Sequence, residues 1–496
     1  MRLALFALVF SIFTLLAPAA PLAGIARTVA ASAHALVTTG TLDVATYGDG
    51  DALPSTVVFA GRRRAVTALG ATLALVPAEA LAAATQSIDR PGRIERAAQA
   101  ATAAALAALV CVLFFGRLRA DGLSPRASLA FSLALAFATP LLWFARVPDG
   151  TALATLLLFV AARAARAVVS AAVVGPEDRR AALKLGLALG ALVVVQPTLL
   201  LAALVLVAWC GLHRYDRLGV PVAVRVAAPL VAGIAIVVLH RAHVHAPAEP
   251  MGDLLQGLDG LVLSTGKSIF LYAPLLLLAP PSLVWLWRTH RAEAQLVLAV
   301  SAAVLLAAAQ LDDWHGDPTW GPRRALPLVP LALEAVALAW HARSSGYAPR
   351  RRASAPLALL TAVGIAVQTV GIGLSPSTYL SVVTDVRAAT GAPSWFAEQP
   401  SECHFIPQFS PILGHAWLLS HRVRNDRHFE INPPYLLLLS TPPKLERIWP
   451  RLTIDWFAPG WPVGAAIAWL LSWALVAAAA AWTLRRRLAT VAASGD

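Results

Sequence analysis

Long apolar runs separated by short polar segments are the main feature of this sequence. A helix needs about 20 apolar residues to cross roughly 30 Å of hydrocarbon, and most of the runs are close to that length. They lie at about 3–25, 98–115, 127–145, 148–174, 182–195, 197–211, 221–240, 268–286, 294–311, 325–342, 355–374 and 461–484. The pattern predicts an all-α polytopic membrane protein with about 12 transmembrane helices.

Basic residues between the runs predict the orientation of the chain. Short cytoplasmic loops are enriched in Lys and Arg. If the N-terminus is cytoplasmic, the even-numbered connections and the tail at Arg485–Arg487 hold the basic clusters and lie inside. Joining the runs around Pro197 into one kinked helix would reverse everything downstream, so two helices are preferred there. The predicted outer segments are 26–97, 241–267, 312–324 and 375–460.

The runs divide the chain into three predicted parts. Residues 1–374 form a transmembrane core that includes the first outer loop at 26–97. Residues 375–460 form an extracytoplasmic loop region, and residues 461–496 form the last helix and a basic cytoplasmic tail. Within the first loop, residues 65–84 are expected to form an amphipathic helix on the membrane surface. The first run also fits a signal peptide, whose cleavage would leave the later topology unchanged.

Composition narrows the class of protein further. Charged residues make up 14% of the chain and hydrophobic residues 58%, whereas soluble domains carry about 25% charged residues. The net charge is +13, but the arginines lie mostly between apolar runs and act as topology signals rather than as a nucleic-acid surface. Cys111, Cys210 and Cys403 are far apart and form no CxxC motif, which argues against a zinc site or a disulfide framework.

The first outer loop carries the candidate catalytic residues. The sequence TGTLDVATYGDGDALP at 39–54 holds Asp49 and Asp51 beside glycines, with Asp43 nearby. A carboxylate near the low-dielectric boundary can have its pKa raised towards the range of a general base. The alternative is an ordinary acidic turn, because Asp and Gly favour turns.

A second polar segment, DDWHGDPTWGPRRALPLVP at 312–330, lies between two apolar runs. Charge at a membrane boundary is costly unless it is paired or functional. We expect Arg323 and Arg324 to grip the phosphate of an anionic donor through forked contacts, with His315 beside them. The alternative is an interfacial belt of Trp and paired charges. The segment also offers ligands for a divalent ion, but no strict spacing is met, so neither a metal site nor a cofactor is assigned.

The segment GLDGLVLSTGKSIFLYAPLLLL at 257–278 is the third candidate. Its Lys267 precedes a membrane helix, whose N-terminus suits a phosphate. The fragment STGKS lacks the upstream glycine of a P-loop, since Leu261 stands there, so ATP binding is excluded. The alternative is a capped helix with a snorkelling Lys. In the later segment, His404, His415, His421 and His428 have no metal spacing and are interpreted as loop residues.

Taken together, these motifs resemble the bacterial membrane proteins of the GT-C glycosyltransferase superfamily that are related to protein-O-mannosyltransferases. The likeness rests on TGTLDVATYGDGD with the later LGATLALVPAEAL, on VVVQPTLLL, on GLVLSTGKSIFLYAPLLLL and on WHGDPTWGPRRALPLVPLAL, in that order. The fragment SPILGHAWLL is similar to a late loop of the same group. The set covers most of the chain.

The resemblance implies a GT-C-like helical bundle with extracytoplasmic loops and surface helices. It implies a polyprenyl-phosphate sugar donor, Asp49 or Asp51 as the base, and Arg323 and Arg324 at the phosphate. This chain departs from the group's usual pattern at Arg62–Arg64, at Gln196 and at Ser264–Ser268.

The predicted function is inverting sugar transfer to an outer-face acceptor, which is a lipid, a glycan or a protein. The predicted location is the bacterial inner membrane. The alternatives are a lipid or polyprenyl-glycan transporter or flippase, and a non-catalytic GT-C-like membrane protein.

Overall fold

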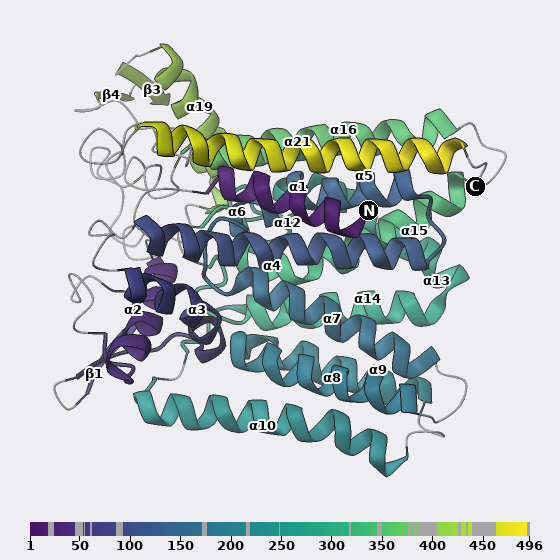
Figure 1. Cartoon of the computed structure of the whole chain (residues 1–496), viewed down its shortest axis with the longest axis horizontal. Coiled ribbons are helices and arrows are strands. Elements are labelled where there is room, and N and C mark those ends of the chain that lie inside the picture. The colour runs from purple at the N-terminus through teal and green to yellow at the C-terminus, as the bar shows by residue number, and fades with distance from the viewer. Residues whose placement is uncertain are drawn as a thin grey trace.

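The computed structural model is a bundle of long helices (Figure 1). It describes residues 1–17, 24–44, 53, 55–59, 62–85, 93–170, 176–214, 219–247, 249–316, 319–344, 350–374, 379, 383, 404–424, 428–432, 435–438 and 463–493. The helices are α1 (Arg2–Leu15), α2 (Gly24–Thr39), α3 (Leu69–Thr85), α4 (Arg93–Ala120), α5 (Pro125–Phe137), α6 (Leu141–Phe144), α7 (Thr151–Ser170), α8 (Pro176–Val195), α9 (Leu200–Arg214), α10 (Val220–Val244), α11 (Leu254–Val262), α12 (Ile269–Tyr272), α13 (Ala279–Thr289), α14 (Arg291–Ala309), α15 (Val329–Ser344), α16 (Arg350–Gly373), α19 (Pro411–Arg424) and α21 (Val463–Ala493).

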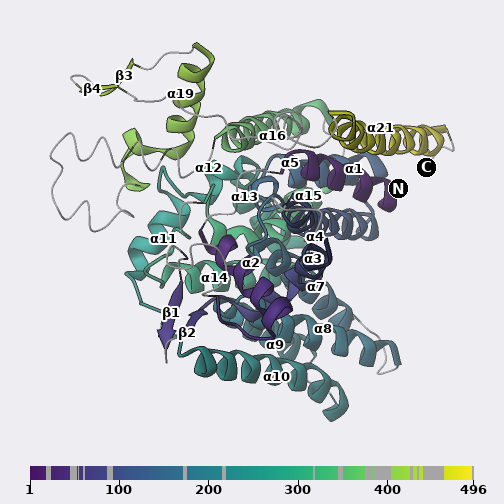
Figure 2. The same ribbon diagram turned by 60° about the vertical axis from the view of Figure 1, so that its left-hand side comes forward.

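Two small antiparallel hairpins complete the described structure. Strand β1 (Thr56–Phe59) pairs with β2 (Arg62–Ala65), and β3 (His428–Asn432) pairs with β4 (Tyr435–Leu438). Both hairpins lie at the end of the bundle that also carries α2 and α3, away from the two chain termini (Figure 1). Figure 2 shows the β3–β4 hairpin projecting from the bundle beside α19.

The prediction of an all-α polytopic membrane protein is confirmed. Within the described residues, seven helical segments are long and apolar enough to cross a membrane: Ile94–Ala120, Thr151–Ser170, Pro197–Arg214, Val220–Val244, Arg291–Ala309, Arg323–Ser344 and Ser354–Gly373. The count of twelve spans stays a prediction, as do the inside and outside faces.

Several predicted helix bounds are wrong, and proline explains most of them. The run at 3–25 is not one helix over the residues that the structure describes: α1 ends at Leu15, before Pro18, which disfavours helical backbone at the residue preceding it, and α2 begins at Gly24. The run at 268–286 is broken into α12, a 3-10 turn and α13, with Pro274 opening that turn. The expected surface helix at 65–84 begins at Leu69, because Arg62–Ala65 pairs in the β1–β2 hairpin.

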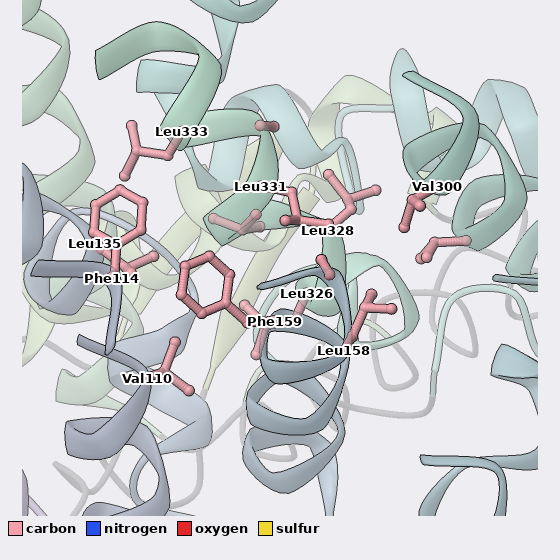
Figure 3. Packing of buried hydrophobic residues seen from close by; sticks show 14 of the residues in the cluster. Val110, Phe114, Leu135, Leu158, Phe159, Val300, Leu326, Leu328, Leu331 and Leu333 are labelled. Carbon is pink, nitrogen blue, oxygen red and sulfur yellow. The ribbon is translucent and has the colours of Figure 1, made fainter. Parts of the chain in front are cut away.

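Aliphatic and aromatic side chains from α4, α5, α7, α14 and α15 form the centre of the core. Figure 3 shows Phe114 and Phe159 lying between these helices, with leucines of α15 above them. Phe114, Phe159 and Leu331 are fully buried. Tight packing of such side chains fixes the helices relative to one another, so the loops at their ends start from fixed positions.

A buried ionic cluster ties four of these helices together. Glu334 of α15 is fully buried, and its carboxylate lies 2.8 Å from Arg117 Nε of α4 and 3.2 Å from Arg166 of α7. Arg166 also pairs with Glu293 of α14 at 2.8 Å. Charges inside a membrane protein are tolerated when they are paired in this way. Removing one partner would leave the others as unpaired buried charges. The cluster therefore constrains the position of α15 relative to the neighbouring helices.

Helix α10 lies at the edge of the bundle and is held there by glycines. A Cβ on Gly190 of α8 would come within 2.3 Å of the Pro229 carbonyl oxygen, and one on Gly233 of α10 within 2.5 Å of the Gly190 oxygen. Small residues let membrane helices approach closely and gain packing contacts. The close approach sets where the end of α10 meets the functional site described below.

Candidate functional site

The polar segment between α14 and α15 is anchored by two tryptophans. Trp314 and Trp320 are 2% and 1% exposed. Trp314 packs against Gly260, where a Cβ would lie 2.2 Å from its ring, and Trp320 packs against Gly371 in the same manner. The alternative of an interfacial belt is therefore wrong for the two tryptophans, because both rings are buried within the protein. The pairing of Arg with Asp that it also expected is found between Arg324 and Asp313.

Lys267 holds this segment through hydrogen bonds to its backbone. Its side chain is buried, and its Nζ donates hydrogen bonds to the carbonyl oxygens of Thr319 at 2.8 Å and Gly321 at 3.3 Å. The alternative of a snorkelling Lys is thus also wrong. The neighbouring Thr265 donates to the His404 carbonyl oxygen at 3.1 Å. The STGKS fragment therefore connects the 312–324 segment to residues from 404 onward.

His315 and His404 pack together beside Lys267. Their ring centroids are 5.4 Å apart, and both rings contact Trp314. Burial, together with the Lys267 ammonium, lowers the pKa of His315 to about 4 and lowers the pKa of His404 well below its usual value. His415 is fully buried against Trp320. The interpretation of His415 as a loop residue is wrong, because it lies in α19; the side chains of His421 and His428 lie outside the described part of the structure.

A cavity of about 400 Å³ lies next to this segment, where the ends of several helices meet. Its walls come from α2, the β1–β2 hairpin with the start of α3, the start of α7, the residues between α8 and α9, the end of α10 and the segment before α15. The lining residues used below are Ser55, Asp149, Thr151, Pro197, Thr198, Arg241, Glu249, Asp313, Arg323 and Arg324.

Close backbone contacts bring these walls together. Gly150 has a φ of +87°, which favours glycine, and a Cβ there would lie 2.7 Å from the Ala71 side chain. A Cβ on Gly70 would likewise lie 2.6 Å from Val195. The start of α3 therefore sits directly on the segments that open α7 and close α8.

Each arginine that lines the cavity, among the described residues, pairs with a carboxylate. Arg323 Nε lies 3.0 Å from the Asp149 carboxylate and donates to the Thr151 hydroxyl at 3.2 Å. Arg324 forms an ion pair with Asp313 and donates to its carbonyl oxygen at 3.2 Å. Arg241 pairs with Glu249 at 3.3 Å. The cavity thus holds guanidinium groups whose charge is already balanced.

Asp149 is held in place before any ligand is considered. Its side chain is 4% exposed, and its carboxylate accepts hydrogen bonds from the Thr151 backbone N–H and hydroxyl, both at 2.9 Å. Asp149 was not among the residues predicted from the sequence, because it lies at the edge of an apolar run. The available signal was the Asp-Gly-Thr order, which is typical of a helix start.

Of the four residues predicted to bind the donor phosphate, two line the cavity and two do not. Arg323 and Arg324 line the cavity. Lys267 and His315 lie behind the segment that carries these arginines and, within the described residues, are not part of the cavity lining. Their predicted contact with phosphate stays untested.

Asp49 and Asp51 lie outside the described residues, and so does Asp317. The chain on either side of the first two is described: Val44 and Leu53 are both buried in one small cluster with Ala31 and Ala65. The Val44 N–H also donates to the Arg63 carbonyl oxygen at 2.8 Å. Ser55, two residues after Leu53, lines the cavity. The role of Asp49 and Asp51 as bases stays a prediction.

The described residues hold no cluster of three or more His, Cys, Asp or Glu suited to a metal ion. A divalent ion therefore gains no support from the part of the chain that the structure describes. Cys111 and Cys210 are buried, free thiols; Cys403 lies outside the described residues.

These features define a multi-pass membrane protein with a charge-lined cavity at one end of its bundle. The fold is similar to that of ArnT, for which two solved structures match. ArnT from Cupriavidus metallidurans bound to undecaprenyl phosphate matches with a TM-score of 0.50 and 14% sequence identity, over 85% of this chain and 72% of that one. ArnT in the apo state matches with a TM-score of 0.48 and 14% identity, over 84% and 75%. No protein-family model and no curated protein matches the sequence.

The lowered pKa values of His315 and His404 predict an acid-sensitive fold. A folded-state pKa below the unfolded value of about 6.5 means that the unfolded chain binds more protons between the two values. Stability is then complete above about pH 6.5 and is lost as the pH falls towards 4. We expect the apparent Tm in detergent to fall between pH 6.5 and 5, and the double variant His315→Gln and His404→Gln to show a shallower fall. The exposed His243→Gln variant is the control, and an unchanged slope in the double variant would contradict this account.

Proposed function

We propose that this protein transfers a sugar from a polyprenyl-phosphate donor to an acceptor on the outer face of a bacterial inner membrane. The observation that carries the proposal is the cavity of about 400 Å³ lined by Arg323 and Arg324 in a GT-C-like fold. Guanidinium groups bind phosphate oxygens through forked, charge-assisted hydrogen bonds. The matched ArnT structure is bound to undecaprenyl phosphate, which supports a donor of that class.

The proposed reaction is a single inverting displacement. The base takes the proton of the acceptor hydroxyl as its oxygen attacks the anomeric carbon of the sugar. The bond from that carbon to the phosphate oxygen breaks, and the polyprenyl phosphate leaves with the negative charge. Arginines that are already oriented stabilise this charge without reorganisation; Arg323 is oriented by Asp149 and Arg324 by Asp313.

Asp49 and Asp51 remain the proposed bases. The support is the anchoring of the chain around them: Val44 and Leu53 share one buried cluster, and Ser55 lies in the cavity wall. Among the described carboxylates, Asp43 accepts a hydrogen bond from the Arg63 N–H at 3.2 Å and Asp313 is paired with Arg324. They are the next candidates.

The flippase alternative needs charged residues that are available to a head group crossing the membrane. Arg166 pairs instead with Glu293 and Glu334, and Arg163 donates to the Leu113 carbonyl oxygen at 3.4 Å. Both contacts favour a structural role for these arginines. The non-catalytic alternative is decided by the second experiment below.

Arg324 gives the cleaner test of phosphate binding. Its partner Asp313 is 42% exposed, whereas Asp149, the partner of Arg323, is 4% exposed. We expect Arg324→Ala to weaken binding of undecaprenyl phosphate by about ten- to a hundred-fold with little change in Tm. Arg323→Ala is expected to weaken binding and also to lower the Tm, because it leaves a buried carboxylate unpaired. Arg324→Lys should restore part of the affinity, since an ammonium lacks the planar fork. Unchanged binding in both Ala variants would remove these arginines from the site.

Substitution of the proposed bases tests the reaction itself. We expect Asp49→Asn or Asp51→Asn to lower transfer from a labelled polyprenyl-phosphate sugar by about 10²–10⁴-fold, while donor binding and protein level persist. Asn keeps the shape and loses the proton acceptor. The double variant should be no better than the worse single variant. Near-normal transfer by the double variant would move the base to Asp43 or Asp313, and wild-type protein that transfers from no donor would favour the non-catalytic alternative.

A further inference from the structure

An apolar groove of about 480 Å³ adjoins the cavity on the side of the bundle formed by α9, the end of α10 and the end of α14. Leu200, Leu201 and Leu204 line it from α9, and Ala307 and Leu311 line it from α14 and the residues after it. Leu201 and Leu204 are 40% and 48% exposed. Exposed leucines on a helix that is long and apolar enough to cross a membrane suit contact with lipid rather than with water.

The groove and the cavity meet at four residues that line both: Pro197, Thr198, Arg241 and Glu249. Two of these carry charge. Arg241 lies in the last turn of α10 and donates to the Pro247 carbonyl oxygen at 2.5 Å while pairing with Glu249 at 3.3 Å. A single ion pair therefore sits where an apolar surface becomes a polar one.

The fold of the chain after α10 creates this pair. His245 ends the helix with a φ of +55°, a left-handed conformation that is uncommon for a residue other than glycine. The backbone then turns back, and the Ala246 N–H donates to the Arg241 carbonyl oxygen at 2.9 Å. Pro247 and Glu249 are brought over the Arg241 side chain as a result.

The pair at the junction is the most exposed of the cavity's ion pairs among the described residues. Arg241 and Glu249 are 28% and 44% exposed, whereas Arg323 and Asp149 are 16% and 4% exposed. An exposed ion pair contributes little stability, about 0–1 kcal/mol. Glu249 can therefore be replaced as the partner of Arg241 at small cost, while the Arg323–Asp149 pair is held by burial.

We propose that the groove takes the isoprenoid chain of a polyprenyl phosphate and that Arg241 exchanges Glu249 for the lipid phosphate as the head group enters the cavity. The inference rests on the proposed function and adds the route by which the donor reaches Arg323 and Arg324. A polyprenyl phosphate matches the junction because it carries its charge at one end of a long apolar chain. Free phosphate fits less well because it has no apolar chain to fill the groove. An uncharged lipid fits less well because it has no phosphate to replace Glu249 as the partner of Arg241.

The test measures binding to the full-length protein in detergent by native mass spectrometry, with undecaprenyl phosphate, undecaprenol and inorganic phosphate as separate probes. Wild-type protein should prefer undecaprenyl phosphate to both of the others. Arg241→Ala should reduce that affinity about tenfold or more, and Arg241→Lys should reduce it less. Glu249→Gln should raise it about two- to fivefold, because Arg241 loses its competing partner. Arg225→Ala, at the opposite end of α10, is the matched control and should bind as the wild type does.

The proposal predicts a loss of affinity for Arg241→Ala and a gain for Glu249→Gln. If Arg241→Ala is poorly folded, the gain in Glu249→Gln still tests the proposal, because structural damage does not raise affinity. If Glu249→Gln weakens binding as Arg241→Ala does, the pair is structural and the exchange is wrong. If wild type prefers undecaprenyl phosphate and Arg241→Ala binds it equally well, this inference fails while the proposed function stands. If wild type shows no preference for undecaprenyl phosphate over undecaprenol, both fail.

Discussion

The ion pair between Arg323 and Asp149 is the contact on which the architecture of the site depends. It joins the segment before α15 to the segment before α7 across the cavity, and Thr151 adds hydrogen bonds to both partners. A guanidinium and a carboxylate that are this well buried stay charged only if each keeps its partner or gains an equivalent one. The site is therefore built to hold a guanidinium in a fixed direction. A phosphate that enters meets a positive group whose position is already determined.

The rest of the bundle places the ends of several helices around the cavity. Glu334 with Arg117 and Arg166 fixes α15 against α4 and α7, and buried Trp314 and Trp320 fix the segment between α14 and α15. The helices supply their own backbone hydrogen bonds, so irregular backbone is confined to their ends, as a membrane requires. Irregular segments from distant parts of the sequence consequently gather at one end, where they form a polar cavity next to an apolar groove.

Much of the fold could be predicted from the sequence, because apolar runs of about twenty residues have few solutions in a bilayer. The helix ends were less predictable. Whether Pro274 bends a helix or starts a new one depends on the packing around it, which no local pattern records. Lys267 was predicted to bind the donor phosphate, with a snorkelling side chain as the alternative. It is buried, and its ammonium donates hydrogen bonds to the carbonyl oxygens of Thr319 and Gly321, a contact between distant segments that no local pattern records.

The arginines of the segment before α15 were found from the sequence, since charge next to an apolar run is conspicuous. Their partners were not. Asp149 lies more than a hundred residues before Arg323 in the chain, and only the fold brings them together. The Arg241–Glu249 pair depends on the left-handed backbone conformation of His245, which the identity of the residue does not predict.

The central claim is that the cavity receives the phosphate of a polyprenyl lipid with the lipid chain in the adjoining groove. The most direct measurement is an electron cryomicroscopy structure of the wild-type protein in nanodiscs that contain undecaprenyl phosphate. The account predicts phosphate density within contact distance of Arg241, Arg323 or Arg324, and chain density along Leu201 and Leu204 of α9. Lipid phosphate bound at another face of the bundle, with the cavity holding only water, would contradict it.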